Sequence, residues 1–405
     1  MKDEKKAPKL RFKGFTDDWE QCKLGDVGTF KGGFGFPENE QGNDSGIPFY
    51  KVSDMNDRYN ALMMKRASNY VSDSQIDINN WKPILGQNII FAKVGAAVYL
   101  ERKRKVVGPF LLDNNMMSFQ PKNADIDYIY YIFQRLHISK HAQVGTLPSL
   151  NAGELRNIEI NIPSLAEQRV VANIGVKIDQ TITLHEEKKR QLERLKSALL
   201  QKMFADKSGY PDIRFEGFSD EWEQCKLGDV CEPITDSIDT QKYPNEVFAE
   251  YSMPAFDASM KPYIVLGSSM NSVRKIITRP CLLVNKLNVR KKRIWYVKKP
   301  NKNAVCSAEF IPLRSDTVDL TFLNQVAKSE TFTRYLENHS SGSSNSQKRI
   351  TPRSLMLSKL HIPTIEEQKL IGKIFEYLDH TITLHDQKLN LLKLVKQSLL
   401  QNMFI

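Results

Sequence analysis

The feature that most constrains this chain is a long segment that occurs twice. Residues 161–204 align without a gap with residues 361–404, at an offset of 200 positions. Self-similarity at one fixed offset is typical of an internal duplication rather than of shared helical composition. The chain is therefore expected to fold as two related halves.

A second duplicated block opens each half. Residues 8–27 read PKLRFKGFTDDWEQCKLGDV and residues 211–230 read PDIRFEGFSDEWEQCKLGDV. The two are about three-quarters identical, which is far above chance for this length. Each half thus has a near-constant opening, a variable middle and a near-constant end.

The two middles differ in sequence but share a layout. Each has an apolar run that predicts a buried strand, then a basic segment, then an amphipathic stretch that predicts a helix. In chain order these are 88–93, 101–105 and 127–136 in the first half, and 281–286, 290–293 and 320–336 in the second. We therefore expect an α+β protein with two mixed domains and two long helices. The expected boundaries are 1–160, 161–209 (helix and linker), 210–360 and 361–405.

Each duplicated end carries start signals for a long helix. Ser164 and Thr364 precede Glu167 and Glu367 by three residues, which predicts a capping box in both copies. Apolar residues then alternate at spacings of three and four, which is typical of a coiled-coil seam. The seam residues are Val171, Ile174, Ile178, Leu192, Leu195 and Leu199, and in the second copy Ile371, Ile374, Leu378, Leu392, Val395 and Leu399.

Polar residues interrupt this seam at matching places. They are Thr181, His185 and Lys188 in one copy and Thr381, His385 and Lys388 in the other. Such residues usually fix the register or the partner of a coiled coil. A catalytic or metal-binding role for the histidines, or a break into two shorter helices, is the alternative. A continuous helix of this length would span about 60 Å at 1.5 Å per residue and would serve as a spacer.

Composition narrows the class of partner. A net charge of +11 and a pI of about 9.2 favour a polyanion, although an anionic membrane surface also suits a basic protein. The five cysteines form no CxxC pair, so neither a disulfide framework nor a zinc site is predicted. No secretory signal or transmembrane run is apparent, and we expect a cytoplasmic protein.

The candidate nucleic-acid contacts are basic and polar residues of the two middles. Lysine and arginine neutralise phosphates, and arginine also reaches guanine in the major groove. The alternative interpretations are a solvated hairpin for the basic segments and a plain linker for the Gly- and Ser-rich loops. The candidates are Lys31, Gly33, Lys93, Arg102, Lys103, Arg104, Lys105, Gly145 and Thr146, and in the second half Lys286, Arg290, Lys291, Lys292, Arg293, Gln347, Lys348 and Arg349.

Catalytic motifs are missing from the sequence. The glycine-rich residues 31–37 match neither a Walker loop nor a dinucleotide-binding turn, and Glu186 with Lys188 lacks the partner aspartate of a nuclease site. There is no NPPY or DPPY run of an adenine methyltransferase and no GxSxG or HExxH motif. We expect a binding protein with no metal of its own.

The paired motifs RFxGFxDxWEQCKLGDV and IPxxxEQ…D…TITLH…LLQxMF resemble the specificity subunit of bacterial type I restriction-modification systems. The resemblance implies that each middle is a target recognition domain reading half of a bipartite DNA site, with the long helices antiparallel as a spacer. It also implies a non-catalytic chain that binds no cofactor and assembles with two modification subunits and two motor-nuclease restriction subunits. Those partners would hold S-adenosylmethionine, ATP and Mg.

The family's helix-start motif falls on Glu167, Gln168, Glu367 and Gln368, and the resemblance implies capping and subunit docking there. Half-sites approached from one face of a duplex lie about 34 Å apart. Because the two middles differ, the target should be asymmetric. The alternative from another class is a coiled-coil protein scaffold whose basic patches are incidental.

Overall fold

The computed structural model describes residues 7–404 apart from 144, 146, 206, 207, 343, 345 and 346. The chain divides into two compact units. Unit 1 holds Met1–Glu186 with Gln387–Ile405, and unit 2 holds Glu187–Asp386. Each unit therefore combines one mixed domain with the first part of one long helix and the last part of the other. The expected boundaries set the helices apart as separate segments, so the observed division differs from them.

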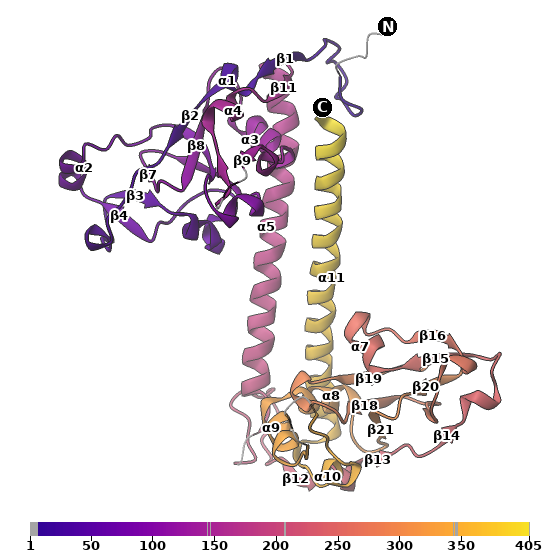
Figure 1. Ribbon diagram of the computed structural model, residues 1–405. Helices are drawn as coiled ribbons and strands as arrows, with labels where there is room; N and C mark the ends of the chain where they lie inside the picture. The colour runs from indigo at the N-terminus through magenta and orange to yellow at the C-terminus, as the bar shows by residue number, and fades with distance from the viewer. Residues whose placement is uncertain are drawn as a thin grey trace. The chain divides into compact units, whose positions relative to one another are not determined.

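The first segment of unit 1 contains the first duplicated opening and runs into the first long helix, and its second segment is the end of the second long helix (Figure 1). Its elements are β1 (Glu20–Lys23), α1 (Leu24–Val27), β2 (Gly28–Gly32), β3 (Ile47–Tyr50), β4 (Asn69–Val71), α2 (Asp73–Asn79), β5 (Gln87–Ala92), β6 (Lys103–Val107), β7 (Leu111–Leu112), β8 (Met116–Pro121), α3 (Ile126–Arg135), β9 (Ala142–Gln143), β10 (Ser149–Leu150), α4 (Ala152–Arg156), β11 (Glu159–Ile162) and α5 (Leu165–Lys202).

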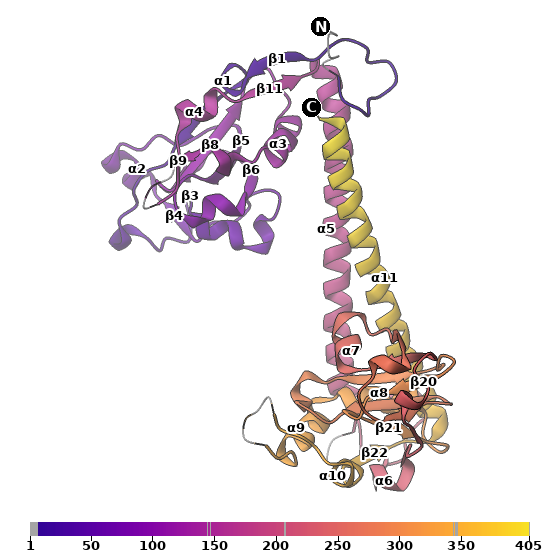
Figure 2. The same ribbon diagram turned by 45° about the vertical axis from the view of Figure 1, so that its right-hand side comes forward.

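The central sheet of unit 1 is antiparallel, in the order β2-β8-β5-β6. Strand β5 is buried along most of its length, as its apolar run predicts, and α3 packs against β5 and β6 (Figure 2). Phe119 and Phe133 join sheet and helix, with ring centroids 5.1 Å apart. A smaller sheet, β4-β3-β7, lies beside this one in the same unit.

Unit 2 has the same order of main elements as unit 1 but a different second sheet. Its elements are β12 (Glu223–Lys226), α6 (Leu227–Val230), β13 (Glu232–Pro233), β14 (Ser237–Ile238), β15 (Val247–Tyr251), α7 (Met253–Ser259), β16 (Tyr263–Leu266), β17 (Arg274–Ile276), β18 (Cys281–Asn285), β19 (Ile294–Val297), β20 (Ala304–Cys306), β21 (Phe310–Arg314), α8 (Leu320–Lys328), α9 (Glu330–Asn338), α10 (Pro352–Met356), β22 (Lys359–Ile362) and α11 (Ile365–Met403).

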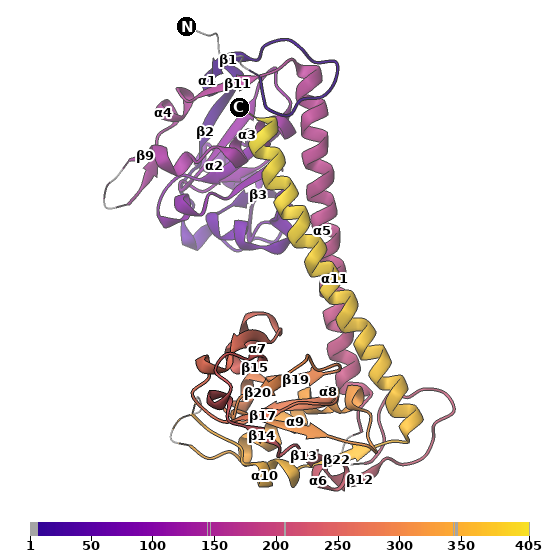
Figure 3. The ribbon, with the colours of Figure 1, turned by 90° about the vertical axis from the view of Figure 1, so that its right-hand side faces the viewer.

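The main sheet of unit 2 has the order β13-β21-β18-β19, which corresponds strand for strand to that of unit 1. Helix α8 packs against β18 and β19 (Figure 3). The second sheet differs, because unit 2 has five strands in the order β14-β17-β20-β15-β16 where unit 1 has three. One frame with two different surfaces is what the aligned layouts predict.

The duplicated blocks contact each other within each unit. Strand β1 of the opening pairs antiparallel with β11, which leads into α5, and β12 pairs in the same way with β22. The equivalent cysteines Cys22 and Cys225 lie opposite Ile160 and Leu360 in these ladders. The two near-constant parts of each repeat thus build one structural base.

The long helices run antiparallel beside each other within each unit (Figure 1). In unit 1 the Asp179 carboxylate of α5 accepts from Lys396 of α11 at 2.6 Å. In unit 2 the equivalent pair is Lys196 with Asp379. Helix α5 is one unbroken helix and so is α11, so the alternative of two shorter helices in each copy is wrong. The expected fold class is confirmed.

The seam differs in phase from the prediction towards the helix ends. Leu195 and Val395, expected in the seam, are exposed. Lys196 and Lys396, one position later, are half-buried and make the ion pairs described above. A lysine can hold this position because its aliphatic stem covers apolar surface while its ammonium reaches a carboxylate.

Candidate nucleic-acid interface

In unit 1 the structure brings the loop before β10 to the end of the buried strand β5. The Leu150 amide donates to the Lys93 carbonyl at 2.8 Å, and the Gly95 amide donates to the Pro148 carbonyl at 2.8 Å. Gly145 is exposed in this loop, whereas Thr146 lies outside the described residues. Two segments that are far apart in the sequence, residues 93–95 and 148–150, thus lie together, and we name this region the corner of unit 1.

Unit 2 has the same corner. The Ile350 amide donates to the Lys286 carbonyl and the Asn288 amide to the Lys348 carbonyl, both at 3.0 Å. Lys348 lines a small polar hollow together with Arg290. The exposed Gln347 belongs to the same loop. The candidates near 286–293 and near 347–349, which the sequence places about 60 residues apart, therefore lie together.

The basic segment of unit 2 is largely neutralised by carboxylates from other elements. Two pairs lie at this turn, Arg290 with Glu337 at 2.5 Å and Lys292 with Glu330 at 2.5 Å. The hydrogen bond from the Lys292 ammonium holds the pKa of Glu330 below its usual range. Lys291 is exposed and is in no ion pair within the described parts of the chain.

Arg293 and Arg349 each make two hydrogen bonds to one carboxylate. Arg293 is buried and donates two hydrogen bonds to Asp257, at 2.7 and 2.6 Å, which lowers the pKa of that carboxyl group. Arg349 donates to both oxygens of Glu309 at 2.8 and 2.7 Å. The prediction that Arg293 contacts DNA is corrected, because a buried guanidinium with both forks occupied holds the fold together.

The basic segment of unit 1 is also less available than predicted. Lys103 is only 1% exposed, pairs with Glu101 and donates to the Leu136 carbonyl at 3.1 Å. Burial lowers the pKa of Lys103 and that of Arg104. The prediction of a DNA contact at Lys103 is therefore corrected, since this ammonium is buried against Glu101 and the Leu136 carbonyl.

The remaining basic neighbours are tied to polar partners. Lys105 pairs with Asp127 and lies 5.3 Å from the centroid of the Tyr130 ring. Arg102 donates to the side chain of Asn56.

The glycine-rich turn after β2 has a packing role. A Cβ at Gly33 would lie 2.0 Å from the Asp113 carbonyl oxygen, so only glycine allows this approach. The neighbouring Phe34 amide donates to the Leu112 carbonyl at 2.7 Å. Lys31 is exposed on β2 and remains a candidate contact.

The helix-start motif does a different job from the expected one. Glu167 is 1% exposed, and its two carboxylate oxygens accept from Arg11 of the first opening at 2.7 and 2.8 Å. Glu367 makes the same bidentate pair with Arg214 at 2.8 Å for both bonds. The expected return of these carboxylates to a capping box is therefore corrected, since both are buried inside the chain, and their use in subunit docking stays a prediction.

Only the other half of each predicted capping box is present, and it is long. The Glu167 amide donates to Ser164 Oγ at 3.4 Å and the Glu367 amide to Thr364 Oγ1 at 3.5 Å. At this length each contributes little to helix initiation.

The glutamines of the motif connect each helix start to the mixed domain. Gln168 Nε2 donates to the Pro163 carbonyl at 2.9 Å, and its Oε1 accepts from the Asp125 amide at 2.9 Å, where α3 begins. Gln368 makes the same two bonds in unit 2, to the Pro363 carbonyl at 2.8 Å and from the Asp319 amide at 2.9 Å. Both glutamines are buried and hold each helix start to its mixed domain, and their expected docking role stays a prediction.

The polar seam residues behave unequally. Thr181 and Thr381 donate back to carbonyls of their own helices, at 2.7 and 2.8 Å. His185 and His385 are half-buried. Lys188 and Lys388 are exposed and lie off the seam.

The cation that faces the other helix at this level is the next lysine. Lys189 reaches Asp386 at 2.7 Å, and this hydrogen bond raises the pKa of Lys189. The expectation of a seam position for Lys188 and Lys388 is corrected by one residue.

Sequence reasoning missed one cationic group in unit 1. Arg58, Lys65 and Arg66 are exposed around Tyr59, and they take part in no ion pair among the described residues. No run of basic residues marks them, because tyrosine, asparagine and four apolar residues (59–64) separate Arg58 from Lys65 and Arg66 in the sequence. Within the described ranges, no cluster of histidine, cysteine or acidic side chains could hold a metal ion.

Comparison with known proteins gives the family. The family model described as type I restriction modification DNA specificity domain matches residues 16–194 and 219–394. The chain belongs to this family. Each match covers one mixed domain and most of one long helix, so the internal repeat is a repeat of this domain. Members of the family are specificity subunits and not enzymes.

Three curated relatives come from Methanocaldococcus jannaschii. The type I restriction enzyme MjaVIII specificity subunit is 21% identical over 399 residues, covering 90% of this chain and 87% of the relative. The MjaIX specificity subunit is 22% identical over 230 residues, covering 53% of this chain. The alignments with MjaIX and with the putative MjaX subunit span about half the length of those relatives, 51% and 52%.

Solved structures share the fold. The crystal structure of a type I restriction-modification S subunit from M. genitalium matches with a TM-score of 0.65 at 14% identity, over 98% of this chain and 99% of that one. A structure from work on complex assembly of the type I R-M system matches with a TM-score of 0.50 at 14% identity, over 94% and 96%. In the part of the chain that the structure describes, no helix has the length and apolar character to cross a membrane.

Proposed function

We propose that this specificity-domain protein reads an asymmetric bipartite DNA sequence, one half-site with each unit, for a type I restriction-modification complex. The observation that carries the proposal is a duplicated frame with one sheet order and two different second sheets. A common frame positions two readers in the same way, while unlike surfaces read unlike sequences. The chain itself performs no chemistry.

The partners in this proposal are double-stranded DNA, two modification subunits and two restriction subunits. S-adenosylmethionine, ATP and Mg act on those subunits. Docking would use the exposed apolar side chains of the long helices, such as Leu184 and Leu384 at equivalent positions and Leu391 and Leu394 nearby. Exposed leucines on an otherwise charged helix are typical of a covered face.

The DNA contacts in this proposal come from the two corners and the exposed cations beside them. Lys31, Lys93 and Gly145 serve unit 1, while Lys286 and Lys348 serve unit 2. Lys291 and Gln347 complete the second set, with Arg290, Lys292 and Arg349 released from their carboxylates when a phosphate approaches. Exposed ion pairs are weak enough, at about 0.2–1 kcal/mol, for such an exchange.

Methylation mapping tests the proposal directly. Genomic DNA is sequenced by a single-molecule method that detects N6-methyladenine, with and without this gene in an otherwise complete system. We expect one bipartite motif to lose its methylation when the gene is deleted. An unchanged set of methylated motifs would refute the proposal.

A protein scaffold is the second candidate, and the neutralised basic segments favour it. It predicts no sequence preference and little salt dependence in a DNA titration. A DNA reader that neutralises Z phosphates gives a slope of about −0.9Z in log K against log salt. A titration over NaCl concentration with duplexes of matched and scrambled sequence separates the two.

A further inference from the structure

Asn60 organises an irregular loop of unit 1, residues 56–66, here named the Asn60 loop. This side chain is fully buried. Its Nδ2 donates to the carbonyls of Asp54 at 2.9 Å and Arg66 at 2.8 Å, and its Oδ1 accepts from the amides of Lys65 at 2.8 Å and Arg66 at 3.1 Å. An asparagine has two donors and one acceptor oxygen, so its capacity is fully used. The two ends of the loop are fixed against each other.

The loop is also fastened to the main sheet. The Met64 amide donates to the Lys105 carbonyl at 2.8 Å, and the Lys105 amide donates to the Leu62 carbonyl at 3.0 Å. These bonds occupy the outer edge of β6. Arg104 adds a hydrogen bond of 3.4 Å to the Met55 carbonyl. The basic segment at 101–105 therefore holds the Asn60 loop in place through hydrogen bonds.

The exposed side chains of this loop are cationic and aromatic. The Arg66 guanidinium carbon lies 4.0 Å and that of Arg58 4.7 Å from the centroid of the Tyr59 ring, which is 43% exposed. Arg58 also donates to the Tyr59 hydroxyl at 2.9 Å. Lys65 is exposed beside them. Guanidinium groups held against a ring lose less conformational freedom when they bind a planar anion or base edge.

Among the described residues, the nearby carboxylates accept hydrogen bonds from residues in and next to the loop, and not from its arginines. Asp54 is buried and accepts from the Ser68 amide and hydroxyl at 3.0 and 2.5 Å. Asp57 accepts from the Tyr59 amide at 2.9 Å. Unlike the turn at 290–293, the Asn60 loop offers arginines whose charge no side-chain carboxylate of the described chain pairs with.

We infer that the Asn60 loop is a DNA-contacting element of the first recognition domain. Arg58 and Arg66 contact the duplex through phosphates and base edges, Lys65 neutralises a phosphate, and Asn60 is the positioning residue. The inference rests on the proposed function and adds the residues of unit 1 that bind the duplex.

The test uses the full-length chain and a double variant, Arg58→Ala with Arg66→Ala. Binding is measured by fluorescence anisotropy with a duplex carrying the motif found by methylation mapping, over a range of NaCl concentrations. We expect affinity to fall about tenfold or more per arginine, as for good guanidinium contacts. The salt slope should fall by about 0.9 for each phosphate contact that is lost.

The matched control removes the same number of charges at the other end of the sheet. Lys122 and Arg156 are exposed there, and Lys122→Ala with Arg156→Ala should keep the affinity within about threefold of wild type. A third variant, Asn60→Ala, keeps every cation but frees the loop, so its affinity should fall while the salt slope changes less.

The outcomes separate the two proposals. If the wild-type chain shows no sequence preference and no salt dependence, the proposed function fails and the inference falls with it. If the wild-type chain binds its motif and the Arg58→Ala, Arg66→Ala variant binds equally well with the same slope, the inference alone is refuted. Circular dichroism and thermal unfolding of each variant verify that the fold is retained.

Discussion

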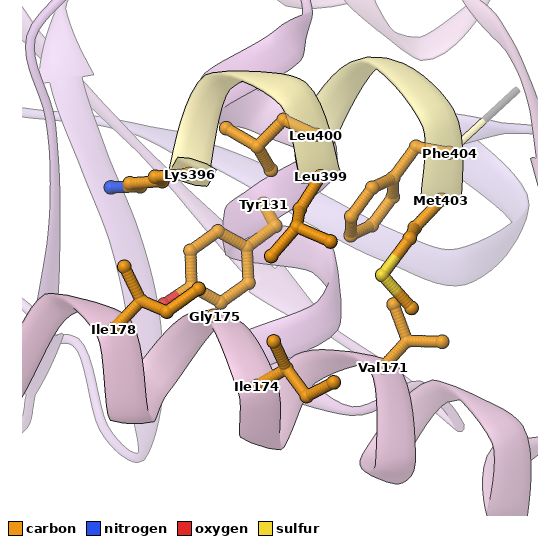
Figure 4. A pocket seen from close by; sticks show the side chains of 10 residues that line it. All are labelled: Tyr131, Val171, Ile174, Gly175, Ile178, Lys396, Leu399, Leu400, Met403 and Phe404. Carbon is orange, nitrogen blue, oxygen red and sulfur yellow. The ribbon is translucent and has the colours of Figure 1, made fainter. Parts of the chain in front are cut away.

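Replacing Gly175 with alanine should destabilise unit 1, although alanine is the better helix former. A Cβ at this position of α5 would lie 2.5 Å from two ring carbons of Tyr131, within the apolar pocket shown in Figure 4. The ring cannot easily retreat, because it is buried and its hydroxyl donates to Asp179 at 2.8 Å. Asp179 is itself held by Lys396.

Two opposing terms set the magnitude. Glycine to alanine inside a helix gains about 1 kcal/mol of intrinsic propensity. Overpacking a fixed neighbour costs about 1–3 kcal/mol, and the fixed position of Tyr131 favours the upper part of that range. The net expectation is a loss of about 1–2 kcal/mol, or a Tm lower by about 2–8 °C for a unit of roughly 200 residues.

Thermal and urea unfolding of the full-length chain measure the effect. The control is Asn173→Ala, two residues earlier on the same helix and exposed, where alanine gains propensity without a clash. Gly175→Ala should lie below wild type and Asn173→Ala at or slightly above it. If both variants are equally stable, the close approach of Tyr131 does not constrain the helix and the reasoning is wrong.

Unit 2 supplies a rescue experiment, because it fills the same place in the opposite way. The residue equivalent to Gly175 is Phe375, and the residue equivalent to Tyr131 is Gln325; both are buried. The large ring thus comes from the long helix in unit 2 and from α3 in unit 1. Gly175→Phe and Tyr131→Gln should each lower the free energy of unfolding. The double variant should lose at least about 1 kcal/mol less than the sum of the two single losses.

Three further outcomes are expected. Glu167→Gln breaks the buried pair with Arg11 and should cost about 3–5 kcal/mol in the free energy of unfolding, whereas a loss below 1 kcal/mol would mean that the pair is incidental. Tyr131→Phe keeps the ring but removes the hydrogen bond to Asp179, which should cost about 1.5–3 kcal/mol in urea unfolding; no change would show that Lys396 alone satisfies that carboxylate. Burial raises the pKa of the Cys22 thiol to about 11, so little thiolate is present at pH 8 and alkylation by iodoacetamide should be slow there and accelerate as the pH approaches 11. Labelling of Cys22 at pH 8 as fast as that of glutathione would contradict this.

The frame of the fold was predictable because the same pattern of elements occurs twice in the sequence. The buried run at 88–93 became β5, the corresponding run at 281–286 became β18, and both lie at the same place in sheets of the same order. Local signals, namely apolar runs and proline before each long helix, were sufficient for these elements. The phase of the helix seam was less predictable, because Lys196 and Lys396 cover apolar surface with their stems while apolar Leu195 and Val395 are exposed.

The candidate site was predictable as a set of residue types but not as a surface. The sequence identified Arg293 and Lys103 as cations available to DNA, and both are buried in the fold. Their neutralising partners are remote or unremarkable in the sequence; Asp257, for example, is 36 positions before Arg293. The role of Asn60 could not be predicted, because no sequence pattern distinguishes it from other loop asparagines and its four hydrogen bonds are visible only in the structure.

The sequence alone determined that the chain is duplicated, that its ends are long helices, and that its two middles share a plan while differing in surface. These properties follow from periodicity and self-similarity, which are local or repeated along the chain. Only the tertiary structure decided which charges are free. Among the described residues, Arg58 and Arg66 have no carboxylate partner, whereas Arg290 and Arg349 each have one, because an ion pair depends on distance in space. The packing of the segments sets that distance in space. The number of residues between two charges in the sequence does not predict it.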